Sequence, residues 1–344
     1  MDVLVRKAIR VASACALAFC SVAGAAAAET ATAKIVKAAN TFLSTLDEKQ
    51  QKSVLYSFTD ETQRANWSNL PTSFVQRGGM SLKDMNAAQR GAAMALVSAA
   101  LSPKGFKKVE QIMQGDQVLK DHEGNNPIFG KDLFYISILG KPSERDPWML
   151  QFGGHHLALN ITIAGEQGIL TPTLTGAQPA LYTENGKTVR PLGGESDKAL
   201  ALLNALDETQ KKQAIVGYKV ADLVLGPGQD GKTIQPEGLK ASAMNEKQRA
   251  MLLDLISEWT GIIHESAAAA RLAQMKADIN ETWFAWSGPT TAEVGKNITA
   301  YYRIQGPHLV IEYAPQKLGG DLSMHVHTMY RDPTNNYGRG SAGK

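Results

Sequence analysis

The chain has only two cysteines in 344 residues, and both lie near its start, at Cys15 and Cys20. If residues 1–28 are removed as a secretion signal, the mature protein contains no cysteine. It then has no disulfide, no thiolate zinc site, no iron–sulfur cluster and no cysteine nucleophile. A chain of this length can bury enough apolar surface to fold without disulfides.

Beyond its first 28 residues the sequence also lacks a hydrophobic run long enough to cross a membrane, and it lacks a charge excess. Three of the 36 basic and one of the 33 acidic residues fall within 1–28, which leaves 33 basic and 32 acidic residues. This balance predicts no nucleic-acid partner and no membrane association after signal cleavage. The motifs of α/β-hydrolases, of His-Glu-x-x-His metallopeptidases and of phosphate-binding loops are missing as well.

The first 28 residues have the pattern of an export signal. Three basic residues precede an apolar run at 11–22, and small residues follow up to Ala28. The small residues suit a signal peptidase, and the apolar run is short beside the roughly 20 residues that a membrane span needs. We therefore expect cleavage before Glu29 and a periplasmic or secreted location in a bacterium.

Three sequence patterns recur in the same order in the two halves of the chain. The matching pairs are 43–52 with 203–212, 85–90 with 244–249, and 154–160 with 306–312. Matches in a constant order indicate an internal duplication. The predicted organisation is a signal peptide at 1–28, a first α+β repeat at 29–178, a linker at 179–198, a second α+β repeat at 199–337 and a disordered tail at 338–344.

Each half is predicted to contain two capped helices followed by an antiparallel β-meander. Asp47, Asn86, Asp207 and Asn245 are each followed three residues later by Gln, and this spacing forms a reciprocal cap at a helix N-terminus. Apolar, β-prone runs follow at 133–139, 148–152 and 156–163, and again at 282–286, 299–304 and 308–313. Gly153 and Gly154 are the expected turn between two of these strands. The predicted class is α+β, with the helices packed on the sheet.

Four of the seven histidines lie in two segments that are expected to be strands. His155 and His156 follow Gly-Gly, and His325 and His327 form a His-x-His in the last predicted strand. Alternate strand residues share a face, so His-x-His places two imidazoles together. Imidazoles without thiolates suit a divalent transition metal such as zinc or copper. We predict that all four histidines are metal ligands, and capping or hydrogen-bonded core histidines are the alternative.

Polar residues near these histidines are candidates for catalysis and binding. The predicted catalytic residues are Glu312 (a ligand or general base), Arg331 (an anion clamp) and Asp332 (a partner for a histidine). The predicted substrate-binding residues are Asn160, His308 and Tyr330. Alternatively, Arg331 and Asp332 form a salt-bridged turn that closes the last strand.

Several long motifs resemble a known family. Gly153–Asn160, Gln305–Tyr313 and His325–Pro333 are similar to the bacterial family designated domain of unknown function 3500. The resemblance extends over residues 35–338 and implies an exported protein, with no reaction assigned to the family. His308 stands where the family often has Arg, which cannot ligate a metal, so we expect His308 to contact an anion. Asn336 replaces an Asp that is common in the family.

These patterns favour an exported, metal-dependent enzyme, hydrolytic or oxidative, that acts on a small-molecule substrate. The evidence is the co-occurrence of Gly-His-His and His-x-His in a chain without mature cysteine. A non-catalytic periplasmic protein that binds a ligand or a partner is the alternative. A metal carrier without turnover is a third possibility.

Overall fold

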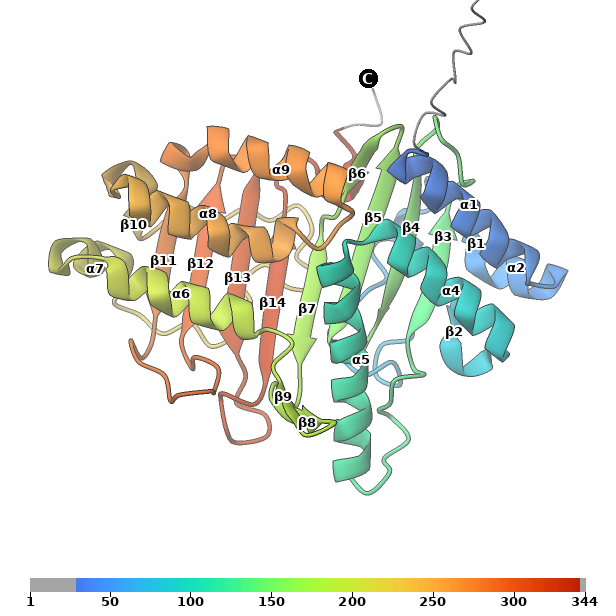
Figure 1. The fold of residues 1–344 in the computed structure, drawn as a ribbon, viewed down its shortest axis with the longest axis horizontal. Helices are drawn as coiled ribbons and strands as arrows, with labels where there is room; N and C mark the ends of the chain where they lie inside the picture. The colour runs from blue at the N-terminus through green and yellow to red at the C-terminus, as the bar shows by residue number, and fades with distance from the viewer. Residues whose placement is uncertain (1–28, 341–344) are drawn as a thin grey trace, which may run out of the picture.

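The structure is a computed structural model, and it describes residues 29–340. The predicted signal peptide at 1–28 and residues 341–344 of the predicted tail lie outside the described residues. Within the described range the protein is a mixed α+β structure, as expected. Its helices lie across one face of a large sheet, which Figure 1 shows from the helical side.

One twelve-stranded sheet runs through both halves of the chain, in the central order β1-β3-β4-β5-β7-β14-β13-β12-β11-β10. Its strands are β1 (Leu55–Tyr56), β2 (Met80–Ser81), β3 (Tyr135–Leu139), β4 (Trp148–Gly154), β5 (Leu157–Ala164), β6 (Gln167–Ile169), β7 (Thr173–Ala177), β10 (Leu239–Lys240), β11 (Trp283–Ser287), β12 (Tyr301–Gly306), β13 (Leu309–Pro315) and β14 (Val326–Arg331). Strand β1 pairs in parallel with β3, and β7 pairs antiparallel with β14. The β7–β14 pair therefore joins the two predicted repeats into one sheet.

The helices come in two groups, one over each half of the sheet (Figure 1). They are α1 (Ala31–Ser44), α2 (Glu48–Val54), α4 (Ala87–Ala100) and α5 (Pro103–His122) in the first half, and α6 (Gly193–Ala205), α7 (Glu208–Ala214), α8 (Glu246–Thr260) and α9 (Glu265–Ala277) in the second. The short α3 (Glu61–Arg64) lies on the opposite face of the sheet, where Gln63 and Arg64 contact Gln151 of β4. The predicted linker at 179–198 contains a hairpin, β8 (Tyr182–Glu184) with β9 (Lys187–Val189), and the start of α6.

All four predicted helix caps are confirmed. Each forms a reciprocal capping box with its glutamine, at the starts of α2, α4, α7 and α8. The two capping glutamines of each half also contact each other: Gln89 donates to Gln50 at 2.9 Å, and Gln248 donates to Gln210 at 2.8 Å. Sequence patterning missed α1, α3, α5, α6 and α9. Helices α6 and α9 have no side-chain cap, whereas α1, α3 and α5 begin at capping residues that were overlooked, Thr30, Asp60 and Ser102.

The predicted turn at Gly153 and Gly154 is wrong, because both glycines lie within β4. The turn consists of His155 and His156. A Cβ on Gly153 would collide with the carbonyl of Leu157, and one on Gly154 would lie 2.7 Å from the carbonyl of Leu133. The glycines therefore allow close backbone approach rather than a change of direction.

Apolar side chains from the sheet and the helices form two large buried clusters, one in each half. A smaller cluster, which includes Trp67, Met329 and Tyr337, lies on the other face of the sheet. Loops cover this face, since the backbone amides of Val224 and Leu225 donate to a side chain of β13. Both faces of the central strands are therefore buried.

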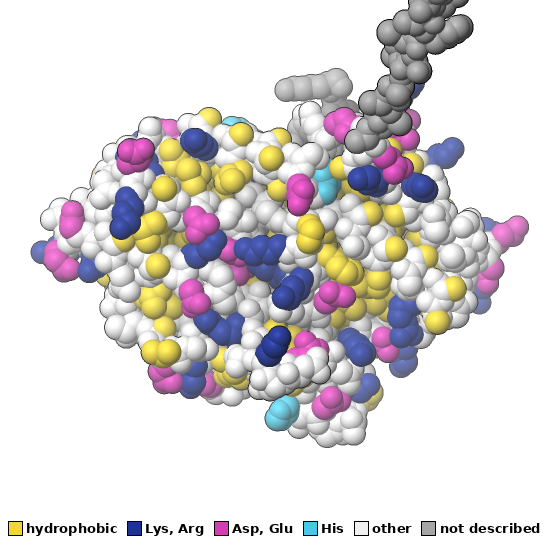
Figure 2. Space-filling view, in the orientation of Figure 1, with side chains coloured by type: hydrophobic (Ala, Val, Ile, Leu, Met, Phe, Trp, Pro, Cys, Tyr) yellow, Lys and Arg dark blue, Asp and Glu magenta, His cyan; other side chains and the backbone are white. Residues whose placement is uncertain are grey.

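Charged side chains join the two helical groups. Figure 2 shows basic and acidic side chains interleaved along the middle of the helical face. Lys108 of α5 pairs with the fully buried Glu195 of α6, and Glu258 of α8 accepts from Lys104 at 2.7 Å. These pairs link elements of different halves, and loss of one partner would leave a buried charge uncompensated.

Candidate metal centre

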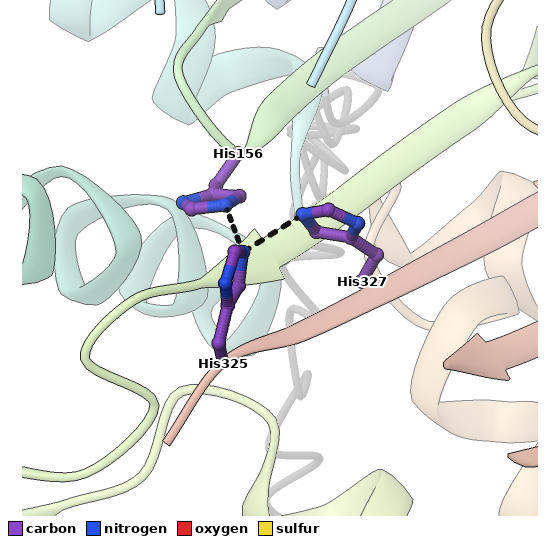
Figure 3. Close-up of side chains that lie close together, drawn as sticks. All are labelled: His156, His325 and His327. Atoms are coloured by element: carbon purple, nitrogen blue, oxygen red, sulfur yellow. Dashed lines mark hydrogen bonds between the residues drawn. The ribbon is translucent and has the colours of Figure 1, made fainter. Parts of the chain in front are cut away.

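Three of the four predicted metal ligands come together where β7 meets β14. His156 lies in the turn between β4 and β5, His327 lies in β14, and His325 immediately precedes that strand. Gly176 of β7 is the register partner of His327, and its amide donates to the carbonyl of His156 at 2.7 Å. Figure 3 shows the three imidazoles pointing toward one another.

The distances between the ring nitrogens are compatible with a shared ion. Nε2 of His325 lies 2.9 Å from Nε2 of His156 and 3.1 Å from Nε2 of His327. One ligand atom from each of the three residues lies within 4.8 Å of the others. Two Zn–N bonds of about 2.05 Å at a tetrahedral angle place their nitrogens about 3.3 Å apart. These three histidines could therefore hold a metal ion after small movements of the rings.

Burial keeps the three imidazoles neutral. It lowers the pKa of His156 well below its usual value, and the neighbouring histidines lower it further. Burial and the charge of His327 lower the pKa of His325 to about 3. Burial also lowers the pKa of His327, although Asp222 acts in the opposite direction. Neutral imidazole is the form that binds metals, so the site is in its binding form at neutral pH.

A hydrogen bond on the far side of its ring orients His325, and Asp222 and Asn69 lie beside the ring of His327. Nδ1 of His325 lies 3.0 Å from the carbonyl of Leu318. Because a carbonyl can only accept, Nδ1 carries the proton and the lone pair of Nε2 points into the cluster. Nδ1 of His327 lies 3.7 Å from a carboxylate oxygen of Asp222. The amide of Asn69 lies 3.4 Å and 3.5 Å from the two nitrogens of the same ring.

His155 lies beside the cluster rather than within it. Its Nδ1 is 2.6 Å from a carboxylate oxygen of Asp116 on α5, and the other oxygen of Asp116 accepts from the amide of Gly130 at 2.8 Å. The ring of His155 stacks on that of His156 at 3.7 Å and on that of Phe129 at 5.2 Å. This stack supports one face of the His156 imidazole.

The backbone around His156 is unusual. His156 has a φ of +62°, in the left-handed region that costs a non-glycine residue about 1 kcal/mol or more. Its amide donates to the carbonyl of Asn69 at 3.1 Å, and its carbonyl accepts from Gly176. A Cβ on Gly176 would lie 3.0 Å from the His156 ring and 3.1 Å from the His327 ring. Glycine at this position therefore leaves room for both imidazoles.

The other six predicted site residues have partners elsewhere. The carboxylate of Glu312 accepts from the amides of Val224 and Leu225 at 2.8 Å each, and from the hydroxyl of Tyr301 at 2.7 Å. The remaining contacts are Arg331 with Asp230, Asp332 with Arg271, Asn160 with Gln151, Tyr330 with Arg271 and His308 with Thr334. The structure does not bring these residues to the three histidines.

Sequence reasoning missed the residues that support the cluster. They are Asn69, Asp116, Phe129, Gly176 and Asp222. None of them stands in a local motif with a histidine. Asp116 lies on the buried face of α5, together with Val109, Ile112 and Lys108. A carboxylate at the helical spacing of these apolar residues was the one available signal.

The fold and the site together define a mixed α+β protein with a buried three-histidine centre. The chain belongs to a family described as protein of unknown function (DUF3500), whose sequence model matches residues 28–339. No curated protein and no solved structure matches the chain. Within residues 29–340, no helix combines the length and the apolar character needed to cross a membrane.

Proposed function

We propose that this protein is an exported metal-dependent enzyme in which His156, His325 and His327 hold a divalent transition metal ion. The observation that carries the proposal is the convergence of three buried, neutral imidazoles on one point. Burying three polar rings against one another costs free energy unless a partner satisfies their lone pairs. A bound cation satisfies all three.

Zinc is favoured over copper. Three imidazoles without sulfur form a common catalytic zinc site, whereas Cu(I) prefers thiolate or thioether ligands. Met329, two residues beyond His327, packs in the apolar cluster with Ala158 and Leu174. The sulfur of Met329 is therefore buried in apolar packing and is not a candidate copper ligand. Zinc has no redox chemistry, so it suits a hydrolytic enzyme rather than an oxidative one.

An enzyme is favoured over a metal carrier. Three protein ligands leave one coordination position for water or substrate, where the ion lowers the pKa of a water or polarises an oxygen. His325 also lines a pocket of about 510 Å³, which offers space for a substrate. The three ligands are only 3–5% exposed, which opposes the rapid exchange that a carrier needs.

Metal analysis of protein purified without a polyhistidine tag tests the proposal. We expect one zinc per chain, and we expect His327→Ala to abolish binding. His308→Ala is the matched control, because His308 is partly exposed and bonded to Thr334. Protein without stoichiometric metal, unchanged after addition of Zn²⁺ or Cu²⁺, would overturn the proposal. Metal binding without turnover would favour the metal carrier.

The proposal includes the internal duplication. Each half has a pair of hydrogen-bonded capping boxes. Leu55 lies parallel to Ile138 in the first half, and Ile215 lies parallel to Trp286 in the second. Both halves then continue into an antiparallel meander. On this view the His-x-His at the start of β14 is an addition made in the second copy only.

The proposal also includes export from a bacterial cell. Its support is the sequence of residues 1–28, with basic residues, a short apolar run and terminal alanines. Cell fractionation and N-terminal sequencing test it. We expect the protein in the periplasm or the medium, beginning at Glu29, and cytoplasmic protein beginning at Met1 would contradict it.

A further inference from the structure

A pocket of about 510 Å³ lies beside the three histidines and shares His325 with them. Three segments form it: the last turns of α5, the chain from Gln178 to Thr183, and the loop from Leu318 to Met324. Its volume is within the usual range for a small-molecule site. Figure 1 shows β8 beside the lower part of α5, where two of these segments meet.

The walls of the pocket are largely apolar. Val118, Leu119, Leu181, Leu318 and Met324 contribute aliphatic or thioether surface. Leu318 is 73% exposed and offers apolar surface at the rim of the pocket. A ligand with an apolar body of several carbons would cover this surface.

The charges around the pocket have one sign. The lining includes Glu123 and Asp321 but no lysine or arginine. The pocket also borders the C-terminal turn of α5, whose backbone carbonyls carry partial negative charge. Lys296 approaches Asp321 at 3.5 Å but does not line the pocket. An anionic ligand would meet repulsion from Glu123 and the helix end, and a weaker repulsion from Asp321, whose charge is partly offset by Lys296 and Ser323.

We infer that this pocket binds a small organic molecule with an apolar body and no negative charge, and that amines are preferred. This inference rests on the proposed function, because the ligand would be the substrate of the metal centre beside it. The same charges weaken the binding of phosphate esters, sulfates and carboxylates. The apolar walls hold the body of the molecule, and the ring of His325 lies between the pocket and the other two histidines.

Three probes of equal shape test the charge preference: 4-phenylbutylamine, 4-phenylbutanol and 4-phenylbutanoate. Binding to the full protein is measured by ligand-observed NMR, with and without Zn²⁺. A carboxylate can bind zinc directly, so the titration without zinc measures binding to the pocket alone. We expect the carboxylate to bind about tenfold more weakly than the amine, the combined effect of two exposed charges and a helix end.

Two substitutions locate the binding. Val118→Trp fills the pocket and should weaken amine binding roughly tenfold or more, because apolar contact drives the binding. Lys107→Trp, on the exposed side of the same helix, is the control. Glu123→Lys should reduce the preference for amine over carboxylate about threefold, the effect of one exposed charge. Glu110→Lys is its control, because Glu110 is exposed on α5 and does not line this pocket.

The outcomes separate this inference from the proposed function. Amine binding that Val118→Trp removes, in a protein that takes up no metal, supports the pocket and overturns the metal centre. Stoichiometric zinc without any probe binding sensitive to Val118→Trp overturns the pocket and leaves the metal centre. Carboxylate binding to the zinc-free protein as tight as amine binding also overturns the inference.

Discussion

The Nε2 atoms of His156 and His325 lie 2.9 Å apart, although 169 positions separate the two residues in the chain. They meet because β7 and β14 pair at the centre of the sheet and Gly176 hydrogen-bonds to the turn that carries His156. The proposed metal centre therefore lies at the β7–β14 pair, which connects the two halves of the sheet. An ion bound there would stabilise the join as well as the site.

Metal should accordingly raise the stability of the protein. A ligand that binds only the folded state stabilises it by about 2.7 kcal/mol at 100 times its Kd. For a chain of this size, we expect Zn²⁺ at that concentration to raise the Tm by roughly 4 °C. Differential scanning calorimetry of the metal-free protein before and after addition of Zn²⁺ measures the shift. His327→Ala should show no shift, and an equal shift in that variant would place the ion elsewhere.

Gly176→Ala should damage the site without touching a ligand. The new methyl group would lie 2.9 Å from the carbonyl of Val326 and about as close to two of the imidazoles. We expect a loss of about 1–3 kcal/mol in the free energy of unfolding, since the packed neighbours cannot move freely. Metal affinity should fall as well. Chemical denaturation and a zinc titration measure the two effects.

Gly91→Ala is the matched control for that substitution. A Cβ on Gly91, in the interior of α4, meets no atom within 4 Å. Alanine there should stabilise the protein by about 0.5–1 kcal/mol through its higher helix propensity. If both variants lose stability equally, the loss is not specific to the crowding between β7 and β14.

The metal-free protein should lose stability in acid. In the unfolded chain the histidines take up protons near pH 6.5. In the folded protein burial lowers the pKa of His325 to about 3 and also lowers the pKa values of His156 and His327. The unfolded state therefore binds more protons between about pH 6.5 and pH 3, and acid favours unfolding. Stability is full above pH 6.5 and falls as the pH decreases.

Each histidine contributes up to about 1.4 kcal/mol per pH unit to this loss. His325→Ala should therefore flatten the pH dependence of the free energy of unfolding in that range, whatever its effect on stability at pH 7. Urea denaturation at several pH values measures the slope. An unchanged slope in the variant would show that His325 is not buried in its neutral form.

Zinc binding should release few protons. The imidazoles of His156 and His325 are already neutral at pH 6 in the folded protein, because burial lowers the pKa of His156 well below its usual value and that of His325 to about 3, and burial lowers the pKa of His327 as well. Three histidines with an ordinary pKa of about 6.5 would release about two protons at that pH. Isothermal titration calorimetry at pH 6, in buffers of different ionisation enthalpy, counts the protons. Release of two or more protons would contradict the lowered pKa values of the buried histidines.

Parts of the fold could be predicted because their signals are local. An Asp or Asn followed three residues later by Gln satisfies backbone donors within one helical turn. The structure confirms all four caps that this spacing predicted, at Asp47, Asn86, Asp207 and Asn245. The Gly153–Gly154 turn was wrong for the opposite reason. Glycine is suited both to turns and to close backbone approach, and only the neighbouring chain distinguishes the two.

The features of the site also divide into those with a local sequence signal and those that depend on long-range contacts. The sequence by itself determined that His325 and His327 share a face, because side chains alternate along a strand. It also determined the absence of thiolate ligands in the mature chain. Only the tertiary structure decided that His156 joins them while His155 turns to Asp116. The position of His156 in the cluster depends on its left-handed backbone conformation and on the pairing of β7 with β14. That pairing joins segments that are far apart in the chain.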